Sequence, residues 1–263
     1  MKIACIGDNC IDSYDETGKY YPGGNAVNVA VYLRRLGLES SYVGAVGNDE
    51  NGERLRRALL EKGVDVSRLR VIDGPTAVSH VRMLDGDRVF GAYEEGVMAD
   101  FRPTQEDVEF LCIHDLAAAT LWGHAESILP ELHRRGIPTA FDASERPLCE
   151  TARIALPHTS LFFFSDSNSE DDALRDKLRA LRSMGPELVI ATRGGRGSLA
   201  FDGTEFYTAD VVPCPVVDTL GAGDSYIAGF LAAWLSRQPV PICMTAGAKN
   251  AAVTIGYTGA WKR

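Results

Sequence analysis

The sequence Val217-Asp218-Thr219-Leu220-Gly221-Ala222-Gly223-Asp224-Ser225 leads directly into the apolar residues 226–235. The apolar run predicts a helix, and the three small residues just before it let a ligand approach the backbone closely. N–H groups at a helix start lack partners within the helix and lie at its positive end, so this loop favours an anion. Asp224 can there accept a proton from a hydroxyl that attacks a phosphoryl group. Alternatively, Asp224 caps the helix and the glycines form a tight turn.

Outward from this loop, short apolar runs alternate with amphipathic segments along the chain. Strands are expected at residues 3–6, 41–46, 117–122, 138–141, 161–164, 188–191 and 198–201. Helices are expected at residues 26–36, 52–62, 107–113, 128–135, 170–184, 222–235 and 241–255. The alternation predicts an α/β fold with a doubly wound, mostly parallel sheet flanked by helices. Ligands of such folds bind beyond the carboxyl ends of the strands.

Two β-type runs, residues 76–84 and 88–93, interrupt this rhythm and are joined by Asp85-Gly86-Asp87, a strong hairpin signal. We expect a small β lid, formed by about residues 12–22 and 75–95, that closes over the ligand. Because motifs near both ends of the chain must meet, residues 1–263 are expected to form a single domain. The exposed edges of such a lid favour pairing, so a homodimer through the lid is expected.

The composition excludes some classes of protein. The 263 residues include 27 Lys and Arg against 36 Asp and Glu, a net charge of −9. An acidic chain lacks the basic face that nucleic acids or anionic membranes require, so neither partner is expected. No apolar stretch is long enough to span a membrane. The six cysteines are scattered, which fits reduced thiols and a cytoplasmic location.

A second motif is Tyr21-Pro22-Gly23-Gly24-Asn25-Ala26-Val27-Asn28, at the start of the first predicted helix. Gly23 and Gly24 let the backbone lie against a ligand. Asn28 offers both a donor and an acceptor, which suits a polyhydroxylated substrate. Asn25 as a helix N-cap is a compatible alternative.

In this order and at opposite ends of the chain, the two motifs resemble the signatures of the PfkB-type, ribokinase-like carbohydrate kinases. The resemblance implies a ribokinase-like fold with a β lid and ATP-dependent phosphorylation of a sugar hydroxyl. It implies that Asp224 is the general base, and that Gly221, Ala222 and Gly223 form the anion hole. It also implies sugar contacts, and the residues concerned are Asp8, Asp12, Gly23, Gly24 and Asn28.

Two further stretches support the resemblance. Thr192-Arg193-Gly194-Gly195-Arg196-Gly197 resembles the family's nucleotide loop, which implies that Thr192, Gly194 and Gly197 contact ATP; a hairpin turn explains these glycines equally well. Phe141-Asp142-Ala143-Ser144-Glu145-Arg146 resembles the family's Asp-x-Asn-x-Arg at a strand end, with Ser144 in place of Asn. There is no Gly-x-x-x-x-Gly-Lys-Ser/Thr, so a P-loop kinase is excluded.

The expected cations are Mg²⁺, because the charge of ATP must be neutralised, and K⁺, which many relatives use. Family members usually carry Asn-x-x-Glu after a strand, to organise Mg²⁺ through water. Here Asn168, Glu170 and Asp171 stand near that place, and an acidic helix start explains them equally well. The resemblance places a monovalent cation near Asp218 and Thr219.

Five strings resemble one group within the family, the bacterial fructoselysine 6-kinases, which phosphorylate O6 of a fructosamine. They are Gly7-Asp8-Asn9-Cys10-Ile11-Asp12, Arg88-Val89-Phe90-Gly91-Ala92-Tyr93, Glu95-Gly96-Val97-Met98-Ala99-Asp100-Phe101, Trp122-Gly123-His124-Ala125-Glu126 and Gly259-Ala260-Trp261.

Three kinds of contact suit a fructosamine. Arg88 can bind a carboxylate as a fork, Tyr93 can stack on the substrate, and Glu94, Glu95 and Glu126 can meet an amine. Alternatively, the lid charges are simply solvated, and Trp122 and His124 are packing residues.

Other functions stay open at this stage. A related kinase would act on another sugar, a keto-sugar acid or a nucleoside. A protein of a different class would be a catalytically inactive, sugar-binding sensor, although such a sensor needs no base at Asp224. Ser225 as a hydrolase nucleophile is disfavoured, because it lacks a Gly-x-Ser-x-Gly setting.

Overall fold

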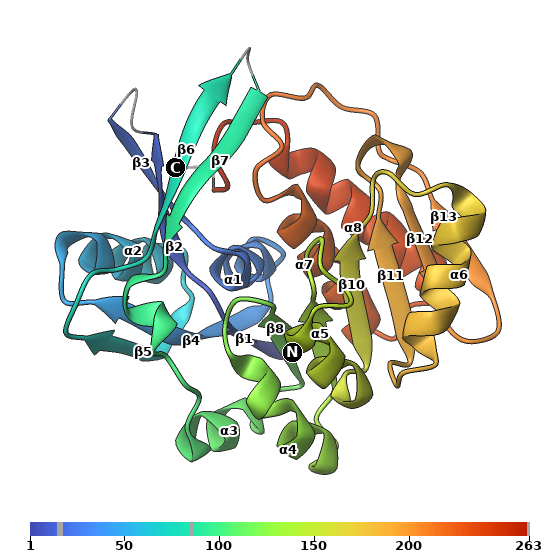
Figure 1. Cartoon of the computed structure of the whole chain (residues 1–263), viewed down its shortest axis with the longest axis horizontal. Coiled ribbons are helices and arrows are strands. Elements are labelled where there is room, and N and C mark those ends of the chain that lie inside the picture. Colours follow the sequence, from blue (N-terminus) through green and yellow to red (C-terminus); the bar gives the residue numbers. More distant parts are fainter. Residues whose placement is uncertain (15–17, 85–86, 262–263) are drawn as a thin grey trace.

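The computed structural model describes residues 1–14, 18–84 and 87–261. In that part of the chain, a nine-stranded sheet forms the body and a four-stranded sheet projects from it (Figure 1). The order of the large sheet is β13-β12-β11-β10-β9-β8-β1-β4-β5. Its strands are β1 (Lys2–Ile6), β4 (Glu39–Gly47), β5 (Asp65–Ile72), β8 (Leu116–Thr120), β9 (Thr139–Asp142), β10 (Leu161–Ser165), β11 (Leu188–Thr192), β12 (Ser198–Phe201) and β13 (Phe206–Ala209). All neighbours are parallel except β12, which runs antiparallel to β11 and β13.

Helices cover both faces of the large sheet. One face packs against α1 (Asn25–Arg35), α2 (Glu50–Glu61), α7 (Ala222–Leu235) and α8 (Val240–Thr254). The other packs against α3 (Gln105–Leu111), α4 (Leu129–Arg134), α5 (Glu150–Ala155) and α6 (Asp171–Arg182). Side chains alternate between the faces, so Ile3 and Cys5 of β1 enter one core while Ala4 and Ile6 enter the other. Strands covered on both sides are therefore continuously apolar, as the sequence of β1 is.

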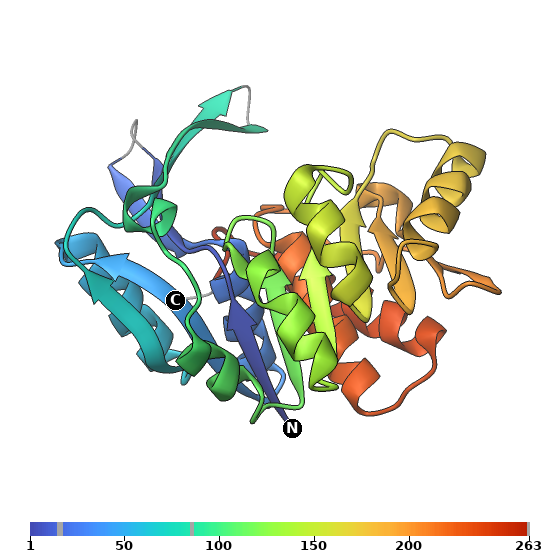
Figure 2. The same ribbon diagram turned by 60° about the horizontal axis from the view of Figure 1, so that its bottom comes forward.

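The small sheet has the order β3-β2-β6-β7, with β2 (Cys10–Tyr14), β3 (Lys19–Gly23), β6 (Val78–Leu84) and β7 (Asp87–Glu94). β6 and β7 form the expected antiparallel hairpin, whereas β2 and β6 pair in parallel. Only residues 7–9 separate β1 from β2. β1 runs from the N-terminus toward the side from which the small sheet projects (Figure 2). The small sheet is thus attached at the carboxyl end of a central strand, where ligands of doubly wound folds bind.

The fold confirms the expected α/β class with a doubly wound, mostly parallel sheet. All of the predicted helices and strands are present, with bounds that differ by a few residues. β5, β13 and α5 were not predicted. β5 was not predicted because it is an edge strand with several charged residues, and α5 was not predicted because it has only 6 residues. Residues 85 and 86 of the expected Asp85-Gly86-Asp87 turn lie outside the described residues.

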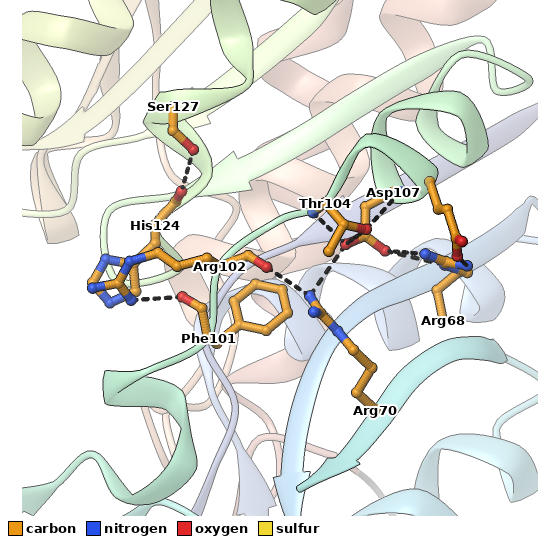
Figure 3. A network of polar contacts seen from close by, with 9 residues as sticks. Arg68, Arg70, Phe101, Arg102, Thr104, Asp107, His124 and Ser127 are labelled. Carbon is orange, nitrogen blue, oxygen red and sulfur yellow. Dashed lines mark hydrogen bonds and ion pairs between the residues drawn. The ribbon is translucent and has the colours of Figure 1, made fainter.

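A buried carboxylate anchors the chain where it returns from the small sheet to the body (Figure 3). Asp107 is fully buried in the first turn of α3, where it and Thr104 form a capping box. Its oxygens accept hydrogen bonds from Arg68 Nη2 at 2.8 Å and Arg70 Nη2 at 3.1 Å, both on β5. Burial raises the pKa of Asp107, but the bonds from Thr104 and Arg68 outweigh it, so the pKa is lowered. The segment between β7 and α3 is therefore held against the edge of the large sheet.

Candidate active site

The start of α7 presents two backbone donors to open space. Gly221 is its N-cap residue with φ 73°, and a Cβ added there would lie 2.2 Å from the Tyr32 hydroxyl oxygen, so only glycine fits. At Gly223, by contrast, an added Cβ would meet no described atom within 4 Å. Of the expected anion hole, Gly221, Ala222 and Gly223, the Ala222 N–H already donates to the Thr219 carbonyl oxygen at 3.2 Å. The N–H groups of Gly223 and of the next residue, Asp224, have no backbone acceptor within the described ranges. Together with the helix dipole, these donors form a site for an anion.

Asp224 lies beside these donors, with its carboxylate held from the opposite side. It is 7% exposed, and its Oδ2 accepts a hydrogen bond from Asn28 Nδ2 at 2.8 Å. Asn28 Oδ1 in turn accepts a hydrogen bond from Trp261 Nε1 at 2.7 Å. The indole can only donate, so it fixes the Asn28 amide with its nitrogen toward Asp224. The N-cap of α7 is Gly221 and Asp224 is the third residue of the helix, so the alternative that Asp224 is the N-cap is wrong.

Three further carboxylates share this site, from Asp8, Asp12 and Asp142. Burial raises the pKa of Asp224 well above its usual value, and the negative charges of Asp142, Asp8 and Asp12 add to this, while the Asn28 bond opposes it. Burial also raises the pKa of Asp142 to about 6, with a contribution from Asp8. A cluster of this sign favours a ligand that brings a positive charge or several hydroxyl donors.

Asp8 ties three elements together at this edge of the large sheet. Its Oδ2 accepts a hydrogen bond from the Asn25 backbone N–H at 2.7 Å, and its Oδ1 accepts one from Thr120 Oγ1 at 2.6 Å. Asp8 thereby joins the end of β1 to the start of α1 and the end of β8. The N-cap of α1 is Gly24 rather than Asn25, and Asn25 is the first helical residue. The alternative that Asn25 is the N-cap is therefore wrong, although its N–H is satisfied by Asp8.

The glycine pair of the second motif makes room for the acidic residues. Gly24 has φ 108°, and an added Cβ would lie 2.5 Å from Asn9 Cα. Gly23 on β3 pairs with Cys10 on β2, and a Cβ added at Gly23 would lie 2.3 Å from Asp12 Oδ2. A side chain at either position would therefore collide with a neighbouring residue, and the absence of one at Gly23 leaves room for the Asp12 carboxylate.

The small sheet contributes residues to the same site. The pKa of Tyr93, on β7, is raised by burial and by the negative charges of the nearby carboxylates Asp8, Glu95 and Asp12. The hydroxyl of Tyr93 therefore lies in the field of the carboxylate cluster. Glu95 directly follows the end of β7 and precedes the 3₁₀ helix η1 (Gly96–Ala99). Arg88 belongs to β7, but its side chain lies outside the described residues.

The nucleotide and magnesium candidates form a second group. Arg196 Nη2 donates to the carbonyl oxygens of Ser167 and Ser169, at 2.7 and 2.9 Å. This brings Thr192, Gly194 and Gly197, around the 3₁₀ helix η4 (Gly194–Arg196), beside Asn168 and Glu170. The loop does form the turn of the antiparallel pair β11 and β12, so contact with a nucleotide stays a prediction.

Asp218 shapes the turn that precedes α7. Its Oδ1 accepts a hydrogen bond from the Leu220 N–H at 2.8 Å, and its Oδ2 accepts one from the Gly259 N–H at 2.7 Å. The second bond holds the C-terminal segment that carries Trp261 against the catalytic loop. Thr219 beside it is exposed. The carboxylate therefore has a structural task, and a monovalent cation at this turn stays a prediction.

Three residues of the site had no assigned role in the sequence: Thr120, Asp142 and Trp261. Asp142 had a usable signal, because an acid directly after a buried strand lies at the ligand edge of a parallel sheet. Thr120 and Trp261 had none, since their roles depend on contacts with Asp8 and Asn28 across 112 and 233 positions of the chain.

Comparison with known proteins agrees with this geometry. The family model described as "pfkB family carbohydrate kinase" matches residues 2–262. The chain belongs to the pfkB family of carbohydrate kinases. The expectation of an ATP-dependent carbohydrate kinase with a ribokinase-like fold is thereby confirmed.

Relatives of this kinase include curated enzymes of similar length. It is 45% identical to the fructoselysine 6-kinase of Shigella flexneri, over 98% of this chain and 99% of that protein. It is 36% identical to the fructosamine kinase FrlD of Bacillus subtilis, over 99% of this chain and 93% of that protein. Among solved structures, the ribokinase of Arabidopsis thaliana complexed with ribose and ATP matches with a TM-score of 0.85 at 18% identity, covering 98% and 93% of the two chains. In the described ranges of this kinase, no helix is both long and apolar enough to cross a membrane.

Proposed function

We propose that this kinase transfers the terminal phosphoryl group of ATP to a hydroxyl of a fructosamine, O6 of fructoselysine or a close analogue. The observation that carries the proposal is the pairing at the start of α7. A buried carboxylate, Asp224, lies next to the unpartnered N–H groups of Gly223 and Asp224 itself. The Asp224 carboxylate serves as the base for the attacking hydroxyl, and the N–H donors stabilise charge on the transferred phosphoryl group.

The raised pKa of Asp224 suits the role of a base. A carboxylate with its ordinary pKa is a weak acceptor, whereas burial beside Asp142 makes Asp224 a stronger one. The Asn28 bond keeps the carboxylate oriented and favours its ionised form. In the proposed step, the substrate O–H bond breaks as its proton moves to Asp224, and the oxygen forms the new bond to phosphorus.

A fructosamine fits the charge of the site. Such a substrate carries a secondary amine, which is protonated at neutral pH, next to the sugar carbons. The four carboxylates of Asp8, Asp12, Asp142 and Asp224 favour a cation, and the residues of the small sheet near them, Tyr93 and Glu95, carry no positive charge. The names of the relatives at 45% and 36% identity support the same substrate class.

ATP and Mg²⁺ are proposed as cosubstrate and cofactor. Asn168 and Glu170 are exposed oxygen donors beside the loop at Thr192, and oxygen donors are what Mg²⁺ prefers. Mg²⁺ commonly keeps several waters and uses one or two carboxylates together with substrate phosphates, so this sparse donor set fits. When bound, the ion would neutralise phosphate charge, and Thr192, Gly194 and Gly197 would contact the nucleotide. K⁺ near Asp218 and Thr219 stays a prediction.

The small sheet is proposed to act as a lid. It projects from the body beside the site and carries Asp12, Gly23 and Tyr93, and Glu95 follows the end of β7 (Figure 2). Both outer strands, β3 and β7, are edges on which a second copy can pair, so a homodimer through this sheet is proposed as well. A single domain over residues 1–263 and a cytoplasmic location likewise stay predictions.

The test is the near-isosteric variant Asp224→Asn, assayed for coupled ADP release on fructoselysine. Loss of the base is expected to lower kcat by about 10²- to 10⁴-fold while ATP affinity stays within a few-fold. Asp176→Asn is the control, an exposed carboxylate on α6 that pairs with Arg179, and it should keep the turnover of the wild type. Near-normal turnover of Asp224→Asn would refute the assignment of the base. A wild-type enzyme that phosphorylates free sugars but no fructosamine would refute the substrate class.

A further inference from the structure

A cavity of about 270 Å³ opens between the small sheet and the loops that follow β8 and β9. Its lining includes Tyr93 and Glu95, which connect it to the carboxylate cluster, and Trp122, Glu126 and Arg146 on the opposite side. A substrate with its sugar at Asp224 and a long substituent would extend past Tyr93 into this cavity. The cavity therefore lies where the amino-acid part of a fructosamine has to go.

The lining of the cavity includes a hydrogen-bond acceptor without a donor. Glu126 Oε2 is buried and has no hydrogen-bond partner among the residues that the structure describes. A buried carboxylate oxygen left unpaired costs free energy, and an N–H donor from a ligand would remove that cost. Glu126 lies in the 3₁₀ helix η2 (Ala125–Ser127), directly after the loop that contains Trp122 and His124.

The lining also includes a hydrogen-bond donor without an acceptor. The guanidinium of Arg146 lies over the ring of Trp122, 5.5 Å from its centroid. No hydrogen bond or ion pair of this guanidinium to another described side chain exists, and Arg146 is exposed. The ring orients the planar guanidinium, whose paired N–H groups match the two oxygens of a carboxylate.

The loops that carry these groups are held in an unusual conformation. His124 has φ 52° and Ser144 has φ 51°, a region that residues other than glycine seldom adopt. The His124 carbonyl oxygen accepts a hydrogen bond from Ser127 Oγ at 3.2 Å, which closes the turn that leads into η2 (Figure 3). Conformations of this kind often persist where the surroundings position a functional group.

We propose that this cavity binds the free amino-acid end of the substrate, with Arg146 on the α-carboxylate and Glu126 on the α-ammonium. The inference rests on the proposed function and assigns the part of the substrate that the sugar site does not recognise. A zwitterion is the ligand that satisfies an unpaired cation and an unpaired anion facing one cavity. Arg146 thus takes the role that the sequence had led us to expect of Arg88.

The test compares two substrates that share the sugar and the linker. One is fructoselysine, and the other is the fructosamine of cadaverine, which lacks only the α-carboxylate. Arg146→Ala is expected to raise KM for fructoselysine about 10- to 100-fold with little change in kcat, the loss of a charged hydrogen bond. KM for the cadaverine compound should stay unchanged. Glu126→Gln should raise KM for fructoselysine but not for its α-N-acetyl derivative.

Glu145→Gln is the matched control, an exposed acid next to Arg146 that does not line the cavity, and its KM values should equal those of the wild type. Equal effects of Arg146→Ala on both substrates, or none on either, would overturn the inference. In both cases a wild-type enzyme that phosphorylates the two fructosamines leaves the proposed function intact. If the wild type phosphorylates neither, the proposed function itself fails.

Discussion

Replacing Asn28 by leucine should shift the pH dependence of the reaction in a defined direction. Leucine has the same branched shape but cannot donate the 2.8 Å hydrogen bond to Asp224 Oδ2. A hydrogen bond to a charged group contributes about 1.5–3 kcal/mol. At 1.36 kcal/mol for each pKa unit, its loss should raise the pKa of Asp224 by about 1–2 units.

The sign follows from the protonation state that the base needs. Asp224 accepts a proton only when it is ionised, and the Asn28 bond favours the ionised form. Without that bond, protonation sets in at higher pH, so the acidic limb of the kcat/KM profile should move upward by about 1–2 units. Above this limb the variant should recover part of its activity, since the base is again ionised.

The assay is coupled ADP release at saturating ATP across the pH range in which the wild type is folded. Trp261→Phe serves as a graded comparison, because it removes the 2.7 Å bond that orients the Asn28 amide but leaves the amide in place. Its acidic limb should move in the same direction by a smaller amount. If Asn28→Leu lowers kcat/KM equally at all pH values, Asn28 acts on the sugar alone and the reasoning about Asp224 is refuted.

Three further perturbations have expected outcomes. Gly221→Ala should lower the melting temperature, because φ 73° costs about 1–2 kcal/mol for a residue with a Cβ, and this Cβ would also approach Tyr32. Gly223→Ala places its Cβ in open space and should not lower the melting temperature. Equal melting temperatures of the two variants would contradict this reasoning. Asp142→Asn removes a negative charge beside the base, so the acidic limb of kcat/KM should move to lower pH, and an upward shift would be contrary evidence. Asp107→Asn should lower the free energy of unfolding by about 2–3 kcal/mol at pH 7. Because the pKa of Asp107 is lowered in the folded protein, its stabilising contribution is fully present above its pKa in the unfolded chain, near 4, and is lost as the pH falls through its pKa in the folded protein. Urea unfolding at pH 7 and pH 3 should therefore show that the stability difference between wild type and variant shrinks in acid.

Local patterns in the sequence predicted much of the fold. The alternation of apolar and amphipathic segments predicted α7 with its observed bounds and β1 within one residue. β5 was missed because an edge strand with Arg68 and Arg70 buries too little of itself to show an apolar pattern. Strands β2 and β3 were placed only as part of a lid, since the place of this pair in a sheet depends on β6, which pairs with β2 from more than 60 positions away.

The candidate site divides in the same way. The glycines at 23, 24, 221 and 223 were identified from sequence, since a residue without a side chain before a helix is a local signal. The orientation of the Asn28 amide could not be predicted from the sequence, because either its oxygen or its nitrogen can point toward Asp224. The choice depends on Trp261, at the other end of the chain.

Sequence alone determined the class of fold, the family, and the residue types of the catalytic loop, because each is written in contiguous residues whose spacing has a direct physical meaning. Tertiary structure decided which carboxylates meet. Asp8 and Asp12, Asp142, and Asp224 come from three separate parts of the chain, and only their burial at one edge of the sheet raises the pKa of Asp224. The electrostatics of a site depend on distance and burial in space, and neither is a property of any single stretch of sequence.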